Sequence, residues 1–248
     1  MHTRLWEIDA LRGVAVVGMI LYHFSYDLAY FGFFDMWFFR SSLGLAVVHV
    51  GGALFIFLAG ISLTLSYRKS VTYQSSERNL FWKYLKRGVL IFSYGLVISF
   101  LTWIFVPEEM IVFGILHLIG VSIVLSHPFL RLKLPNVVLG IGCIIVGIYL
   151  SNFTLDAPWL AWAGIAPNFF MLDYWPIFPW FGVALLGVYV GNAVYGDEIK
   201  GVGRPAPPLA GIRQVVFLGR HSLPVYLVHQ PIILTALLLL GVVDTGFV

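Results

Sequence analysis

Seven long apolar runs dominate this chain and predict that it crosses a membrane repeatedly. A helix needs roughly 17 to 25 mainly apolar residues to span the hydrocarbon of a bilayer. Hydrophobic residues make up 60% of the 248 and charged residues only 11%, whereas about a quarter of a typical soluble domain is charged. We therefore expect an all-α, polytopic membrane helix bundle that forms a single domain over residues 1–248, with spans at 9–31, 43–66, 84–105, 110–126, 136–152, 174–195 and 221–243.

The distribution of positive charge predicts the orientation of these spans. If the N-terminus lies in the cytoplasm, all of the 15 lysines and arginines except Arg40 fall on the inner side. Cytoplasmic loops of membrane proteins carry such an excess of Lys and Arg. We therefore expect the N-terminus inside and the C-terminus outside. The formal net charge of +3 then suits contact with anionic lipid headgroups, and no nucleic-acid partner is needed to explain it.

Ionisable residues inside the first apolar run are the sharpest functional signal. Such groups are costly within a membrane, so each is a candidate functional residue. Asp9 and Arg12 are three residues apart, and His23 and Asp27 are four apart; on a helix, both spacings place the two side chains on one face. The two pairs lie about 21 Å apart along a helix that rises 1.5 Å per residue. One helix thus carries a polar pair near each membrane surface.

His23 is the leading candidate for catalysis. A histidine can take a proton from a nucleophile near neutral pH and return it, and Asp27, one helical turn away, would orient the ring. A structural hydrogen bond to a neighbouring helix is the alternative interpretation of His23. Spacing alone does not separate the two.

Other histidines fall at a similar depth in the predicted spans. His49 and His117 lie in the outer half of their runs, so they and His23 would converge there, and this convergence would also suit haem iron or another metal. A Cys-based zinc site is excluded, because Cys143 is the single cysteine. His229 lies about 12 Å along the last run from His221, which fits either an interhelical hydrogen bond or a catalytic role.

Asp173 directly precedes the sixth run. An acidic residue is favourable at the N-terminal end of a helix because it complements the helix dipole. Asp173 is therefore expected either to start that helix or to lie at the mouth of an outward-facing pocket.

Taken together, these segments resemble the heparan-alpha-glucosaminide N-acetyltransferase catalytic-domain family, within the transmembrane acyltransferase superfamily, and most closely its short prokaryotic members. The resemblance extends over nearly the whole chain and keeps the order of the motifs. The motifs that carry it are R-x4-D-x2-R-G at 4–13, M-x3-H at 19–23, FIFLAGISL at 55–63, GILHLIG at 114–120, DYWPIFPWFG at 173–182 and GRHSLPVYLVHQP at 219–231.

The resemblance implies transfer of an acetyl group from cytosolic acetyl-CoA to an amine or hydroxyl of a glycan or other envelope acceptor across the membrane. The catalytic histidine of the family maps onto His23. Arginines suit the phosphates of the donor geometrically. We therefore expect Arg12, Arg87, Arg220 and His221 to bind the donor, and Asp9, His49, His117, Asp173 and His229 to line the substrate pocket, without a metal. Direct transfer and an acetyl-histidine intermediate both remain open.

The same resemblance predicts an integral, multi-pass protein of the prokaryotic inner membrane. Its partners would be acetyl-CoA, the acceptor and the lipid bilayer, and a homodimer is left open. The competing interpretation is a membrane carrier or lipid flippase whose buried ionisable residues relay substrate or protons. Paired broken helices in an inverted repeat would favour transport, and none is recognisable in the sequence.

Overall fold

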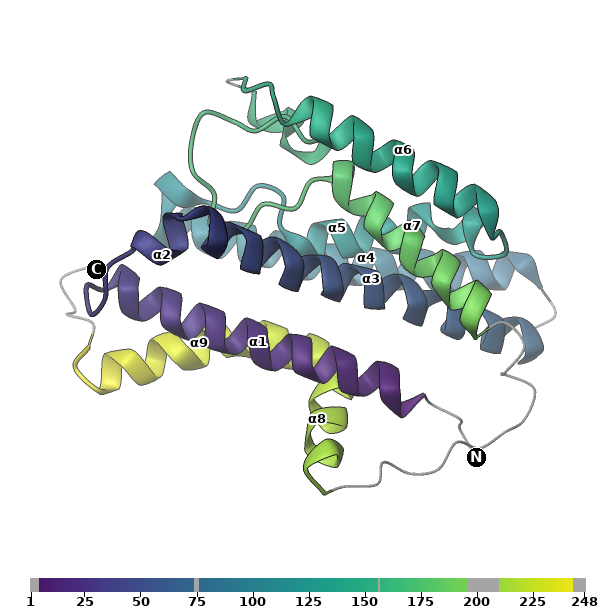
Figure 1. The fold of residues 1–248 in the computed structure, drawn as a ribbon, viewed down its shortest axis with the longest axis horizontal. Helices are drawn as coiled ribbons and strands as arrows, with labels where there is room; N and C mark the ends of the chain where they lie inside the picture. Colours follow the sequence, from purple (N-terminus) through teal and green to yellow (C-terminus); the bar gives the residue numbers. More distant parts are fainter. Residues whose placement is uncertain (1–4, 74–75, 156, 196–209, 243–248) are drawn as a thin grey trace. The chain divides into compact units, whose positions relative to one another are not determined.

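The structure is a computed structural model that describes residues 5–73, 76–155, 157–195 and 210–242. These residues form helices of very different length, joined by turns and short 3₁₀ segments (Figure 1). In chain order the elements are α1 (Trp6–Tyr30), α2 (Trp37–Arg40), α3 (Ser42–Tyr73), α4 (Glu77–Phe105), η1 (Pro107–Glu109), α5 (Ile115–Leu125), η2 (His127–Phe129), α6 (Leu134–Leu150), η3 (Pro158–Ala163), α7 (Ile177–Val194), α8 (Ala210–Arg220) and α9 (Ser222–Leu239).

The all-α class is confirmed. In the described part of the chain, β-structure is limited to one isolated bridge, between Thr154 and Ala166. Five described helices are long and apolar enough to cross a membrane, namely α1, α3, α4, α7 and α9. The expected spans 110–126 and 136–152 correspond to the shorter apolar helices α5, with 11 residues, and α6, with 17. Seven crossings and the orientation of the termini stay predictions.

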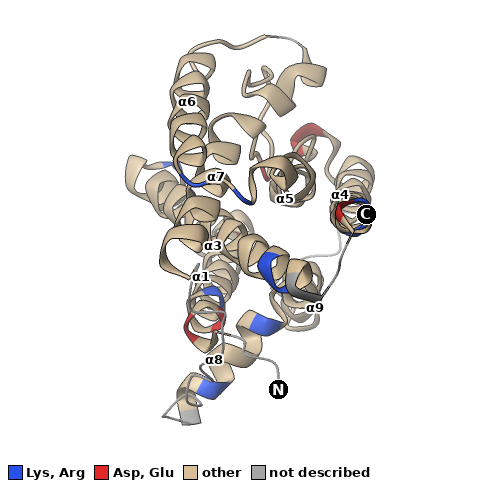
Figure 2. Ribbon diagram, turned by 90° about the vertical axis from the view of Figure 1, so that its right-hand side faces the viewer, with Lys and Arg blue, Asp and Glu red and all other residues tan. Residues whose placement is uncertain are grey.

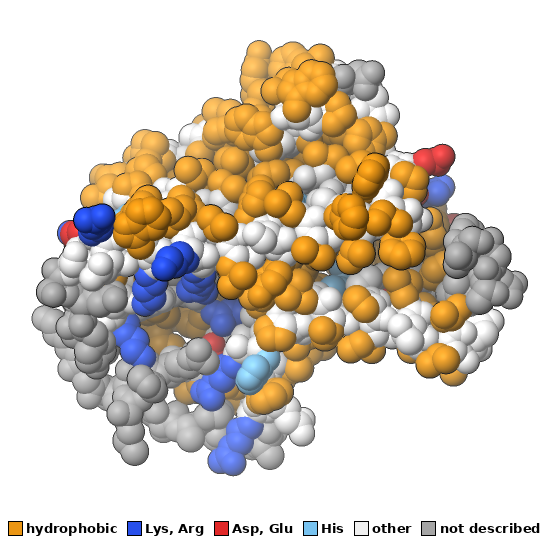
Figure 3. Space-filling model, turned by 180° about the vertical axis from the view of Figure 1, so that it is seen from behind, with side chains coloured by type: hydrophobic (Ala, Val, Ile, Leu, Met, Phe, Trp, Pro, Cys, Tyr) orange, Lys and Arg blue, Asp and Glu red, His pale blue; other side chains and the backbone are white. Residues whose placement is uncertain are grey.

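The helices present the surface that a bilayer requires. Their ribbons carry few charged residues (Figure 2), and large hydrophobic side chains such as Leu21, Val89 and Leu239 are exposed. Hydrophobic side chains also cover much of the face shown in Figure 3. Exposed apolar side chains in this number are lipid-facing rather than core residues, because a bilayer replaces water as the solvent around them.

The chain forms two compact units. The first unit comprises residues 1–55 and 203–248, and therefore contains α1, α2, the start of α3, α8 and α9; the second comprises residues 56–202. Helix α3 is continuous through the boundary. In the second unit, α5 packs against α4, and α7 packs against both α5 and α6. The single domain expected over residues 1–248 stays a prediction.

Two glycines bring α1 and α8 of the first unit into backbone contact. A Cβ atom on Gly13 would lie 2.0 Å from the carbonyl oxygen of Val215, and one on Gly219 would lie 1.7 Å from that of Asp9. No side chain fits in either place. The apolar runs do not predict α8, because its 11 residues are amphipathic and too short for a span.

Candidate functional site

The residues that form the candidate catalytic site come from two helices of the first unit that lie side by side, α1 and α9 (Figure 1). His23 and Asp27 are one turn apart on α1, and His229 and Gln230 are adjacent on α9. The ring centroids of His23 and His229 are 4.9 Å apart, with the ring planes tilted by 58°. We refer to these four residues as the histidine site.

Asp27 is held by α9 and not by His23. The Gln230 side-chain amide donates hydrogen bonds to both carboxylate oxygens of Asp27, at 3.0 and 2.8 Å. In the described part of the chain, no hydrogen bond joins Asp27 to His23, so the pair expected from their spacing is not formed. Asp27 is buried, with 6% of its surface exposed. These hydrogen bonds join α9 to α1.

His229 has a defined tautomer. Its Nδ1 lies 2.6 Å from the carbonyl oxygen of Tyr226, and because a carbonyl only accepts hydrogen bonds, Nδ1 must carry the proton. In the neutral ring, Nε2 then keeps its lone pair. This atom is buried and has no hydrogen-bond partner among the described residues. The site therefore contains a free proton acceptor beside His23.

Aromatic rings connect the histidine site to the loop that follows α1. Tyr22 meets the His23 ring edge-on at 5.9 Å and stacks with Tyr26 at 6.4 Å. Phe39 of α2 lies 5.4 Å from both tyrosine rings. The neighbouring residues Asp35, Trp37, Arg40 and Ser41 line an open pocket of about 350 Å³.

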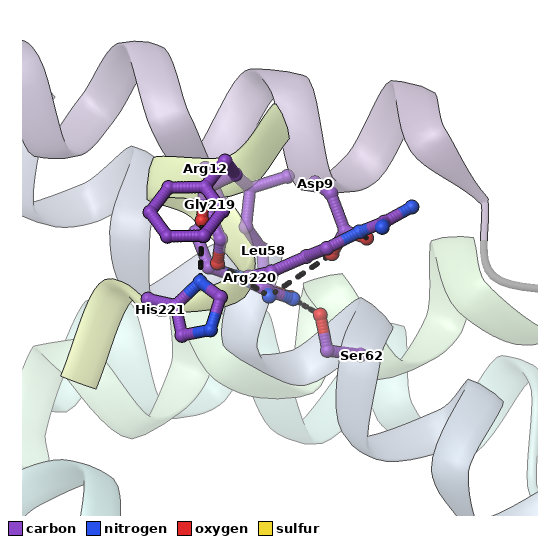
Figure 4. A network of polar contacts seen from close by, with 8 residues as sticks. Asp9, Arg12, Leu58, Ser62, Gly219, Arg220 and His221 are labelled. Carbon is purple, nitrogen blue, oxygen red and sulfur yellow. Dashed lines mark hydrogen bonds and ion pairs between the residues drawn. The ribbon is translucent and has the colours of Figure 1, made fainter. Parts of the chain in front are cut away.

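A charge cluster occupies the opposite end of α1. Asp9 accepts hydrogen bonds from Arg12 Nη1 at 3.4 Å and from Arg220 Nε at 3.2 Å, while Arg12 also donates to the carbonyl oxygen of Gly219 at 3.2 Å (Figure 4). Asp9 is 14 residues before His23, about 21 Å along the helix. It therefore belongs with the two arginines and not, as expected, with the substrate pocket. One carboxylate between two guanidinium groups leaves a net charge of +1.

The remaining donor and pocket candidates are dispersed. His221 lies between α8 and α9, with its Nδ1 2.9 Å from the carbonyl oxygen of Phe217, and His49 lies on the first part of α3. Arg87, His117 and Asp173 belong to the second unit. Among the described residues, no group of three His, Cys, Asp or Glu side chains is placed to hold a metal ion.

The surroundings of His117 indicate a structural role. Its side chain is 2% exposed and packs against the rings of Phe92 and Phe113, with centroids 5.0 and 5.5 Å away. Its Nδ1 accepts a hydrogen bond from Gly114 N–H at 3.1 Å, and Nε2 lies 3.5 Å from the Ser99 hydroxyl. With both nitrogens engaged and the ring enclosed, His117 caps α5 rather than facing a pocket.

Asp173 starts a helix, but not the one expected. Its Oδ2 accepts a hydrogen bond from Ile115 N–H at 2.9 Å, so the carboxylate caps α5, 58 residues earlier in the chain, instead of α7. Gly114 makes room for it, because a Cβ there would lie 2.2 Å from the same oxygen. Burial raises the pKa of Asp173 to about 6, and hydrogen bonds from Ile115 and Trp175 oppose this shift.

We expect the contribution of Asp173 to stability to fall as the pH rises from about 4 to 6. A carboxyl group whose pKa is higher in the folded state than its ordinary value of 3.8 binds its proton more tightly when folded. Its contribution is present below the ordinary pKa and is lost as the pH passes through the folded one. Asp173→Asn removes this titration, so the melting temperature of the variant relative to wild type should rise between about pH 4 and pH 7. A difference independent of pH would contradict the assignment.

Gln230 is the site residue that the sequence alone does not reveal. It follows His229 in the last motif, but its partner Asp27 is 203 residues away. An amide inside an apolar run was the available signal, since a polar group there needs a hydrogen-bond partner.

A comparison with protein families finds one match over most of the chain. The family model described as "Heparan-alpha-glucosaminide N-acetyltransferase, catalytic" matches residues 4–231. The match includes the four residues of the histidine site and the three residues of the charge cluster, Asp9, Arg12 and Arg220. No curated protein and no solved structure matches the chain significantly.

Proposed function

Because this chain belongs to the heparan-alpha-glucosaminide N-acetyltransferase catalytic family, we propose that it moves an acetyl group from cytosolic acetyl-CoA to an amine or hydroxyl of a glycan or other envelope acceptor. Membership implies a membrane acetyltransferase in general, with acetyl-CoA as the donor used by the family. The observation that carries the proposal is the contact between His23 and His229, which both lie within the matched residues.

Acetyl transfer needs one proton to leave the acceptor and one to reach the donor sulfur. As the acceptor nitrogen or oxygen bonds to the acetyl carbon, the thioester C–S bond breaks and the coenzyme leaves as a thiolate. We propose that His23 serves this exchange as general acid and base. A route through acetyl-His23 remains open, and retention of radioactive acetyl by the protein in the absence of acceptor would identify it.

The charge cluster is our proposed contact for the donor phosphates. Arginine pairs well with phosphate oxygens, because its donors form a planar fork. The side chain of Arg220 is 41% exposed and that of Arg12 only 18%, so Arg220 is the better placed to meet a ligand. Arg87 and His221 stay as further proposed donor contacts. The pantetheine arm would extend from the cluster toward the histidine site.

We place the acceptor in the pocket beside α2. Asp35 and Arg40 offer groups that pair with polar or charged substituents, and Trp37, which is 73% exposed, offers a flat apolar face. The chain around Phe39 links this pocket to Tyr22 and Tyr26, next to His23. An acceptor bound there would approach the acetyl group from the end of α1 opposite the charge cluster.

Release of coenzyme A tests the proposed function. Purified protein in detergent or nanodiscs is mixed with acetyl-CoA and a panel of amino sugars and polysaccharides, and free thiol is measured. We expect release that depends on one class of acceptor, with matching acetylation of that acceptor. Thiol release at the background rate with every acceptor would contradict the proposal, and accumulation of a panel compound in proteoliposomes would then favour a carrier.

Cysteine accessibility tests the proposed orientation in the membrane. In a Cys143→Ser background, Lys133→Cys should react with an impermeant maleimide only after the cytoplasmic face is opened, because lysines and arginines gather on that face. Trp159→Cys should react from outside in intact cells. External labelling of Lys133→Cys, or protection of Trp159→Cys, would overturn the order of spans.

A further inference from the structure

We infer that His229 is a second catalytic residue, whose Nε2 takes the proton of the acceptor while His23 delivers one to the sulfur of the donor. This inference rests on the proposed function and divides between two rings the exchange assigned there to His23. It assigns the base of the reaction to α9, within the sequence VYLVHQP at 225–231.

The first support is that Nε2 of His229 is prepared to accept a proton. The bond from Nδ1 to the Tyr226 carbonyl fixes the ring and the tautomer. A buried polar atom without a partner normally costs free energy, so such atoms are rare in folded proteins. The unpaired Nε2 of His229, on a ring in contact with His23, therefore points to a group that arrives during the reaction.

The second support is the contact with His23. At 4.9 Å between centroids, two imidazolium ions would repel each other strongly in a poorly solvated site. The pair therefore holds one proton more readily than two. The other groups near His229 are Asp27, reached through Gln230, and the ring of Tyr226 at 5.5 Å. Asp27 is held by Gln230, and the ring of Tyr22 lies 5.9 Å from that of His23. Among the described residues of this site, the two imidazoles are the groups suited to exchange a proton near neutral pH.

The step balances with both rings neutral at the start. The acceptor attacks the acetyl carbon, its proton passes to Nε2 of His229, and the C–S bond breaks. His23 takes this proton from His229 across the ring contact and delivers it to the thiolate, so both rings are neutral again and no other co-reactant is needed.

We test this inference with His229→Gln and His229→Ala in the full-length protein. The expected result for both is a kcat lower by about 10²- to 10⁴-fold, the usual worth of general base catalysis, with the KM for acetyl-CoA within threefold of wild type. In His229→Gln, the limb of the pH–rate profile that reports the base should be absent. In His229→Ala, added imidazole should restore part of the activity, because it fills the space of the missing ring and supplies the missing base.

The control is His127→Gln. His127 lies in η2 of the second unit and also has a buried Nε2 without a partner among the described residues, but it lies outside the histidine site. This variant should keep the kcat and pH profile of wild type.

The outcomes separate this inference from the proposed function. Absence of acetyl transfer by wild type on the whole acceptor panel would remove the function itself. If wild type is active and His229→Gln has the same kcat and the same pH profile, only the role of His229 is overturned. A lower kcat that imidazole does not restore and that leaves both pH limbs intact would also overturn it, because a merely structural role predicts that pattern.

Discussion

His23→Ala is expected to reduce acetyl transfer by at least about 10²- to 10⁴-fold while leaving the affinity for coenzyme A within about twofold. The reason is that the His23 imidazole is proposed to deliver the proton to the donor sulfur, and its place on α1 is about 21 Å along the helix from the charge cluster that we assign to the donor phosphates. Thiol release at saturating concentrations of both substrates measures the first effect, and calorimetry with coenzyme A measures the second.

Asp27→Asn is the companion to this experiment. It removes the charge of Asp27 but keeps an oxygen that Gln230 can meet, so its effect on kcat should be much smaller than that of His23→Ala. His127→Gln serves again as the unrelated histidine. Turnover of His23→Ala equal to that of wild type would remove His23 from the mechanism, and with it the main argument from the histidine site.

Arg12→Ala is expected to destabilise the protein more than it weakens donor binding. The substitution leaves the buried carbonyl of Gly219 without its partner and takes one of two cations from Asp9, and each unsatisfied buried group costs about 1–3 kcal/mol. For a chain of this size, 1 kcal/mol corresponds to about 2–4 °C in Tm. Thermal unfolding followed in detergent, with and without coenzyme A, measures the loss.

Arg220→Ala provides the contrast. Arg220 is the more exposed of the two arginines, and loss of a hydrogen bond to a charged group is worth about 1.5–3 kcal/mol, which raises Kd for coenzyme A by about 10- to 150-fold. Its Tm should change less than that of Arg12→Ala. A larger loss of coenzyme A affinity in Arg12→Ala than in Arg220→Ala would reverse the roles that we assign to the two arginines.

Local features of the sequence predict where helices form and which side chains are too costly in a membrane to lack a structural or functional role. Hydropathy is a local property, so runs such as 9–31 and 221–243 fall close to α1 and α9. The same local reasoning singled out His23, Asp27 and Asp9, because an ionisable group in an apolar run stands out whatever surrounds it. It also supplied the motifs that the family match covers.

Which of these residues contact one another depends on how the helices pack. Asp27 pairs with Gln230 across 203 residues, and Asp9 pairs with Arg220 across 211. Helical spacing predicted instead that Asp27 would orient His23, because i and i+4 neighbours are the only partners that a single helix reveals. Contacts between helices depend on how closely their backbones approach, and at Gly13 and Gly219 that approach is set by the absence of a side chain.

The structure also separated candidates that look alike in the sequence. His117 and His229 are both histidines within apolar runs, yet both nitrogens of His117 are engaged at the start of α5, whereas Nε2 of His229 is unpaired beside His23. Hydropathy and spacing assign these two residues the same environment. Only the packing of α9 on α1 and of α5 among its aromatic neighbours distinguishes them, because the state of a buried polar atom depends on partners that lie far away in the chain.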